Sequence, residues 1–90
     1  MTNSDGPNVV TSSQSKRITI DNYLFLIEIY RLEKDDLWTL EVADHDGTSH
    51  VWAEQFMSDK EAYNIAVQTI ETEGAIAFMR GDNIIPFRHP

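Results

Sequence analysis

The stretch DLWTLEVADHDGTSHVWAEQF, residues 36–56, decides the fold, because apolar and polar side chains alternate on both sides of an acidic tip. Alternation with a period of two is typical of a β-strand that buries one face. The Asp46-Gly47 pair in the tip is favoured in two-residue turns between antiparallel strands. We therefore predict a β-hairpin with strands over residues 37–43 and 48–56, and we interpret the tip as a turn rather than a calcium-binding or catalytic loop.

The position of this turn predicts the register of the hairpin. With residues 46–47 at the tip, Val42 lies opposite Val51, and Leu40 lies opposite Ala53. One face then collects apolar side chains, namely Trp38, Leu40, Val42, Val51 and Ala53. The opposite face, called the outer face, takes Thr39, Glu41, His50 and Glu54. A shift of one residue would exchange the two faces.

Two further strands are predicted upstream, over residues 17–20 and 23–32. They are separated by Asp21-Asn22, which are common turn residues, and a polar reversal over residues 33–36 leads into the hairpin. Closing this reversal adds apolar side chains to the same face, namely Phe25, Ile27 opposite Val42, and Ile29 opposite Leu40. The two turns lie at separate places in the sequence, and their agreement on one apolar face favours an antiparallel meander.

A helix is predicted to begin after Ser58, because residues 58–61 have the Ser-x-x-Glu pattern of a capping box. Small or apolar side chains then recur at helical spacing, namely Ala62, Ile65, Ala66, Thr69 and Ile70. Gly74 is a typical residue to end such a helix. The predicted fold class is α+β, an antiparallel β-meander of three to four strands with one α-helix packed on one face.

The polar composition of residues 1–15 predicts a disordered N-terminal tail, and residues 16–80 are expected to form a single α+β domain. Residues 75–79 are apolar and are compatible with a fourth strand or a packed tail. The same two alternatives hold for the C-terminal segment 81–90, where Pro86 would restrict any strand to a sheet edge.

The chain is acidic, with 15 Asp and Glu residues against 7 Lys and Arg residues and a formal net charge of -8. Such a surface repels phosphate groups, so we expect neither direct nucleic-acid binding nor membrane binding. The chain contains no cysteine, which excludes disulfides and thiolate metal ligands. Because no secretory signal or apolar run of about 20 residues is found, we expect a cytoplasmic location.

Several apolar side chains are predicted on the outer face, namely Leu24, Leu26, Tyr30, Ala43 and Trp52. In one interpretation, another part of the chain covers them, either residues 75–79 or 84–87 or the hairpin containing residues 17–20. In the other, they form a contact surface for another protein or for an identical subunit. Trp52 and Tyr30 would then be the main anchors, because such residues dominate binding energetics.

A metal site on the outer face is a more specific alternative to a contact surface. Glu28 and Glu41 are expected to lie opposite each other, with His50 diagonal to Glu41 and His45 one step along. Two carboxylates and two imidazoles could ligate zinc or nickel.

The sequence has no nucleophile elbow, phosphate-binding glycine loop or dinucleotide fingerprint, so we predict a protein that is not an enzyme and needs no cofactor.

The runs LWTLEVADHDGTSHVW, EQFMSDKEA and TIETEGAIAF resemble small bacterial proteins of the kind classed as domains of unknown function. The resemblance extends over residues 17–80 and implies no activity. The β-β-β-α order is also broadly similar to the HicB-like and double-stranded-RNA-binding folds. Those folds bind through basic residues, whereas the predicted helix start carries Lys60 against Asp59 and Glu61.

We therefore expect a non-enzymatic protein-interaction module or a homodimer. A first alternative is an acidic decoy that imitates nucleic acid and occupies a basic protein groove, which would require carboxylates spaced like phosphates on the outer face. A second alternative is binding of a metal or a small ligand around Glu28, Glu41 and His50.

Overall fold

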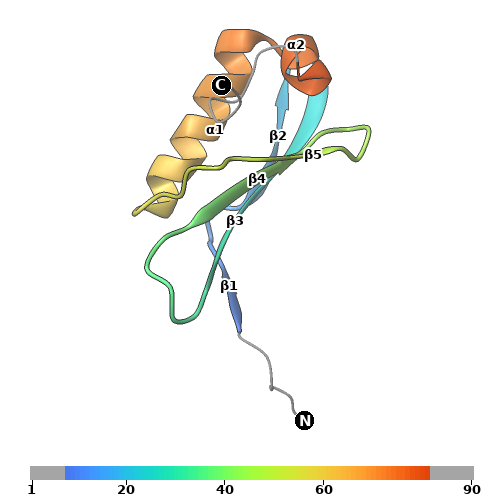
Figure 1. Ribbon diagram of the computed structural model, residues 1–90. Coiled ribbons are helices and arrows are strands. Elements are labelled where there is room, and N and C mark those ends of the chain that lie inside the picture. The colour runs from blue at the N-terminus through green and yellow to red at the C-terminus, as the bar shows by residue number, and fades with distance from the viewer. Residues whose placement is uncertain (1–7, 82–90) are drawn as a thin grey trace.

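The computed structural model describes residues 8–81 and contains one antiparallel β-sheet and two helices (Figure 1). The strands are β1 (Val9–Thr11), β2 (Lys16–Ile20), β3 (Tyr23–Leu32), β4 (Thr39–Ala43) and β5 (Ser49–Val51). The helices are α1 (Asp59–Glu73) and α2 (Ala75–Arg80). This arrangement confirms the predicted α+β class, with one long helix beside an antiparallel sheet.

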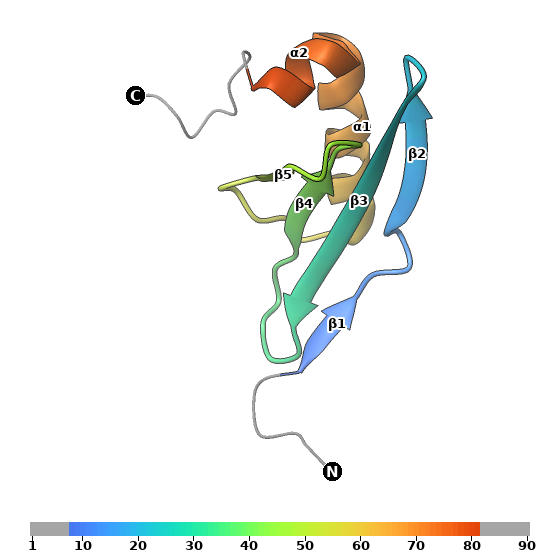
Figure 2. The ribbon, with the colours of Figure 1, turned by 90° about the vertical axis from the view of Figure 1, so that its right-hand side faces the viewer.

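The ten-residue strand β3 organises the sheet. One of its edges pairs with β4, which in turn pairs with β5. Its other edge pairs with two short strands placed end to end, β2 along residues 23–27 and β1 along residues 30–32 (Figure 2). The edge strand is therefore interrupted beside Glu28 and Ile29, where residues 12–15 separate β1 from β2.

The predicted disordered tail is wrong for its second half. Residues 9–11 form strand β1, and Ser12 is buried, with its Oγ donating to Asp59 Oδ2 at 2.6 Å. Polar composition does not reveal this because the ordering comes from backbone pairing with β3 and from one hydrogen bond to α1. Residues 1–7 and 82–90 lie outside the described residues, and so do the predictions made for them, including most of the C-terminal segment 81–90.

The hairpin between β2 and β3 forms at the predicted place. Ile20 pairs with Tyr23, which leaves Asp21 and Asn22 as a two-residue loop with φ of 54° and 69°. Two successive positive φ values are those of a type I′ turn, whose twist matches the twist of the flanking strands. Asp21 also accepts a hydrogen bond from the Ala75 backbone N–H at 3.2 Å, which ties the hairpin tip to the junction of the two helices.

The pairing of β3 with β4 confirms the register predicted from the reversal over residues 33–36, since Ile27 lies opposite Val42. The pairing of β4 with β5 does not follow the register predicted from a turn at residues 46–47. Val42 lies opposite His50 rather than Val51, and Glu41 lies opposite Val51. This shift of one residue turns His50 toward the helices and leaves Val51 46% exposed.

The loop between β4 and β5 explains the shift. Asp44 accepts hydrogen bonds from the backbone N–H groups of Asp46 and Thr48 at 2.9 and 3.1 Å, so its side chain holds a five-residue loop instead of a two-residue turn. Gly47 adopts a φ of +86°, which favours glycine. The strand predicted over residues 48–56 also ends early, because residues 53–55 leave the ladder before Phe56 pairs with Trp38.

Helix α1 begins and ends as predicted. Ser58 Oγ accepts a hydrogen bond from the Glu61 N–H at 3.2 Å, and Gly74 ends the helix with a φ of 89°. Of the two alternatives predicted for residues 75–79, the fourth strand is wrong, because the segment belongs to helix α2 and packs against the core. Helix α2 follows Gly74 without a long loop and buries Phe78, which gives this apolar segment a place in the core.

Both helices contribute to a core that lies on one side of the sheet (Figures 1 and 2). Its buried hydrophobic residues are Phe25, Ile27, Ile29, Leu40, Val42, Trp52, Phe56, Ala62, Ala66, Ile70, Ala75 and Phe78. Over residues 8–81, neither helix has the length and apolar character needed to cross a membrane.

Candidate functional site

The outer face is the side of the sheet that points away from α1 and α2. Alternate residues of β3 and β4 lie on it, together with their partners on the edge strands. Its members include Val9, Thr11, Arg17, Thr19, Leu24, Leu26, Glu28, Tyr30, Leu32, Thr39, Glu41 and Ala43. Leu24 is 46% exposed and Val9 is 60% exposed, and no helix among residues 8–81 covers this face.

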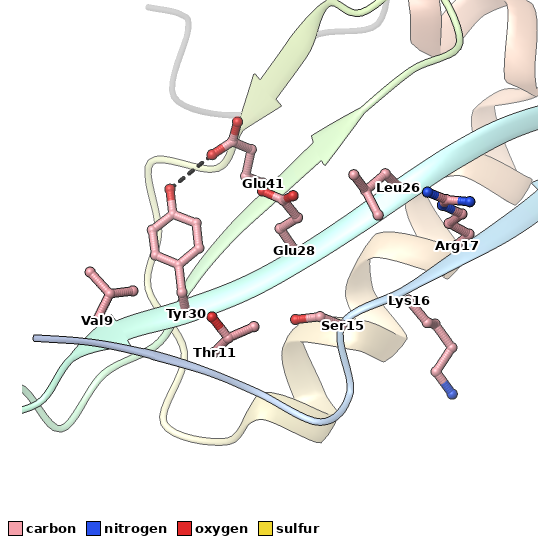
Figure 3. Close-up of a pocket in the computed structure, with 9 residues that line it drawn as sticks. All are labelled: Val9, Thr11, Ser15, Lys16, Arg17, Leu26, Glu28, Tyr30 and Glu41. Atoms are coloured by element: carbon pink, nitrogen blue, oxygen red, sulfur yellow. Dashed lines mark hydrogen bonds between the residues drawn. The ribbon is translucent and has the colours of Figure 1, made fainter.

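A groove of about 640 Å³ lies on the outer face where the edge strand is interrupted. It is lined by Val9, Thr11, Ser15, Lys16, Arg17, Leu26, Glu28, Tyr30 and Glu41. Figure 3 shows the Tyr30, Glu28 and Glu41 side chains on the same side of the sheet, whereas Lys16 points away from them. The Lys16 Nζ lies 5.0 Å from the centre of the Tyr63 ring, on the helix side of the sheet.

Two carboxylates meet at the centre of this groove. Glu28 lies directly opposite Glu41 in the pairing of β3 with β4, and both side chains are half-buried. The Tyr30 hydroxyl donates to Glu41 Oε1 at 2.9 Å. In the part of the chain that the structure describes, neither glutamate forms an ion pair with a basic side chain, although Arg17 lies at one end of the groove.

The electrostatic effect of these carboxylates is visible at Tyr30. Burial raises the pKa of the Tyr30 phenol above its ordinary value of 10.0, and the hydrogen bond to Glu41 raises it further. The negative charges of Glu41 and Glu28 act in the same direction. The phenol therefore stays protonated at neutral pH and serves as a hydrogen-bond donor in the groove.

The structure divides the predicted contact residues into two groups. Leu24, Leu26, Tyr30 and Ala43 lie on the outer face as expected. Trp52 does not, because the shifted register turns it into the core, where it is 6% exposed and stacks on Phe78 with ring centres 6.0 Å apart. The prediction of Trp52 as a contact anchor is therefore wrong.

The predicted metal ligands are not brought together. Glu28 and Glu41 lie on the outer face, whereas His50 points toward the helices, and exposed His45 lies beside Asp46 at the hairpin tip. Among residues 8–81, no group of three or more His, Asp or Glu side chains is arranged to hold a metal ion. The shift in register separates the imidazole of His50 from the carboxylates.

His50 instead forms a buried pair that the sequence analysis missed. Its Nε2 lies 3.0 Å from Asp44 Oδ2, and the side chains are 12% and 1% exposed. Burial alone would raise the pKa of Asp44, but the hydrogen bond with His50 and those from Thr48 and Asp46 outweigh it and lower that pKa. The Phe78 ring lies 4.6 Å from the His50 ring, so the pair faces the core rather than the groove.

Comparisons with protein-family models, curated proteins and solved structures find no match for this chain. The candidate site therefore rests on its own geometry, which is a sheet face that no helix among residues 8–81 covers and on which apolar side chains lie beside Glu28 and Glu41.

Proposed function

We propose that this chain is a non-enzymatic protein-interaction module that binds another protein through its outer face. The observation that supports the proposal is the contrast between the two faces of one sheet. The helices cover one face, while the other leaves Leu24 46% exposed beside Leu26 and Tyr30. Apolar patches of this kind with a polar surround are typical of protein interfaces.

Tyr30 is the central residue of the proposed surface, because Trp52 lies in the core. Its ring provides apolar contact area, and its hydroxyl is already oriented by Glu41. The proposal retains the expected cytoplasmic location and requires no cofactor. A second copy of the chain is the other candidate partner, and the solution mass distinguishes it from a foreign protein.

The decoy alternative finds less support. It requires a row of carboxylates spaced like phosphates, whereas the groove is lined by two carboxylates, those of Glu28 and Glu41, together with apolar side chains, hydroxyl groups and Arg17. The metal alternative lacks an assembled ligand set over residues 8–81.

The proposal is tested by placing one charge on each side of the molecule. Leu24→Lys changes an outer-face residue that is 46% exposed, and Ile76→Lys changes a similar residue in α2 that is 51% exposed. Both variants should keep the melting temperature of the wild type. Proteins captured quantitatively from a lysate of the producing cells should be lost with Leu24→Lys and kept with Ile76→Lys. Equal capture by both variants would contradict the proposal.

A further inference from the structure

We propose that the groove on the outer face binds an arginine side chain of the partner, in a protein segment that carries apolar residues on both sides of this arginine. The inference rests on the proposed function and specifies the chemistry of the partner. It is carried by the interruption of the edge strand, by the pair of carboxylates and by the ring of Tyr30.

The interruption creates room for a side chain. On this edge of β3, pairing with β1 covers residues 30–32 and pairing with β2 covers residues 23–27, so no edge-strand residue lies beside Glu28. The neighbouring backbone is already satisfied, because Ser15 Oγ bonds to the Ile29 N–H and C=O at 2.9 and 3.2 Å and the Ser12 N–H donates to the same carbonyl. A partner is therefore bound at this point by side chains rather than by backbone hydrogen bonds to an added β-strand.

The negative charge of the two carboxylates in the groove favours binding of a cation. Like charges directly opposite each other destabilise a β-sheet, and Glu28 and Glu41 are such a pair. Both are half-buried and form no ion pair within residues 8–81. A cation between them would remove the repulsion and form charge-assisted hydrogen bonds.

Arginine fits this arrangement better than lysine. Its planar guanidinium carries five N–H donors in a fixed fork and can bond to two carboxylates at once. The same plane can stack on an aromatic ring, and Tyr30 lies beside Glu41 with its hydroxyl 2.9 Å from the carboxylate. Leu26 and Val9 line the groove on either side and would contact apolar residues that flank the arginine.

The same charge argues against a second copy as the occupant. The chain carries a net charge of -8, and a symmetric dimer through this face would bring the Glu28-Glu41 pairs of two copies toward each other. A partner with a basic residue is complementary, whereas a second copy is not.

The test uses random peptides displayed on phage, selected for binding to the full-length protein. The enriched peptides should share an arginine with apolar neighbours. For a synthetic peptide of this kind, replacing the arginine by neutral citrulline should weaken binding at least about tenfold, and the double variant Glu28→Gln, Glu41→Gln should lose a similar factor. The control Glu54→Gln, Glu71→Gln makes the same change of charge at two exposed positions and should bind like the wild type.

The outcomes separate this inference from the proposed function. Peptides that bind without an arginine, or equally well with lysine in its place, and that lose binding with Leu24→Lys would overturn the arginine inference and leave the interaction surface standing. Selection of no peptide sensitive to Leu24→Lys would overturn both. Because the glutamine variant removes like-charge repulsion, it should melt at or above the wild-type temperature, and a lower temperature would contradict the charge argument.

Discussion

His50 and Glu41 lie on neighbouring strands, and one step of register decides whether their side chains share a face. In the structure they do not, and each takes part in a different polar pair. Asp44 pairs with His50, whose ring contacts Phe78, and accepts the backbone N–H groups of the β4–β5 loop. Glu41 and Glu28 instead face outward and line the groove. At the residue scale, the first pair contributes to stability, and the second lies on the surface that we propose for binding.

Asp44→Asn should reduce the free energy of unfolding at pH 7 by about 2 kcal/mol, since the buried partners of the carboxylate lose a charged acceptor. The pKa of Asp44 is lowered in the folded state, so its stabilising contribution is present above the unfolded value of about 4 and is lost as the pH falls through the folded value. Urea unfolding at pH 7 and at lower pH, on wild type and variant, measures this difference.

The difference in stability between wild type and Asp44→Asn should therefore shrink on acidification. Asp46→Asn is the control, because Asp46 is exposed at the same loop. A constant difference between wild type and Asp44→Asn down to pH of about 2 would show that the charge of Asp44 does not stabilise the fold.

Trp52→Ala is expected to lower the free energy of unfolding rather than to remove a contact with a partner protein. Removal of a buried aromatic side chain typically costs about 3–5 kcal/mol, and Trp52 is 6% exposed against Phe78. Tyr30→Phe removes only a hydroxyl on the outer face and should cost about 1 kcal/mol or less. Chemical denaturation of both variants checks the contrast, and a similar small cost for the two would place Trp52 outside the core.

At the scale of elements, the β2–β3 and β4–β5 hairpins use different loop chemistry. The β2–β3 loop depends on backbone conformation, with positive φ at both Asp21 and Asn22. The β4–β5 loop depends on a side chain, because the carboxylate of Asp44 accepts the backbone N–H groups of the loop. The first loop therefore follows from local propensity, and the second follows from a buried interaction.

Asn22→Val should destabilise the protein by about 1–2 kcal/mol, because a β-branched residue is strained at the φ of 69° that this position requires. Asn22→Gly is the matched control, since glycine reaches positive φ without strain and is favoured at this place in a type I′ turn. Thermal unfolding of the two variants measures the difference. Equal melting temperatures would mean that the loop does not hold this conformation.

At the scale of the whole molecule, one sheet separates the hydrophobic core from the outer face. Both helices lie on the same side, and α2 extends the cover over Trp52 and His50 through Phe78. Within residues 8–81, nothing comparable lies over the outer face. This asymmetry is the basis of the proposed function.

The isolated protein should be a monomer of 10.3 kDa, because the acidic groove disfavours a symmetric dimer through the outer face. Light scattering on a sizing column at low and high salt measures the mass. Salt screens charge repulsion, so a dimer that appears only at high salt and is lost with Leu24→Lys would make a second copy the occupant of the groove.

Local patterns predicted much of this fold. The Ser58 cap, the helix end at Gly74, the Asp21-Asn22 turn and the pairing of β3 with β4 follow from residues that are close in sequence. The outer-face position of Leu24, Leu26 and Tyr30 follows from the same alternation. Each of these features depends on backbone propensity or on the two-residue alternation of a strand. Both signals are present in the local sequence and do not depend on which residues pack against them in the core.

The register of β4 with β5 depended on the tertiary structure. The Asp46-Gly47 pair favours a two-residue turn, which would bury Val51 and Ala53 and expose Trp52. The folded chain instead buries Trp52 and the Asp44-His50 pair beneath α2, because a large aromatic ring gains more from burial than two small side chains do. The sequence by itself determined strands β2, β3 and β4 and helix α1. Only the tertiary structure decided strand β1, helix α2 and the faces that His50 and Trp52 occupy, because these depend on pairing with β3, on the Asp44 loop and on packing against Phe78.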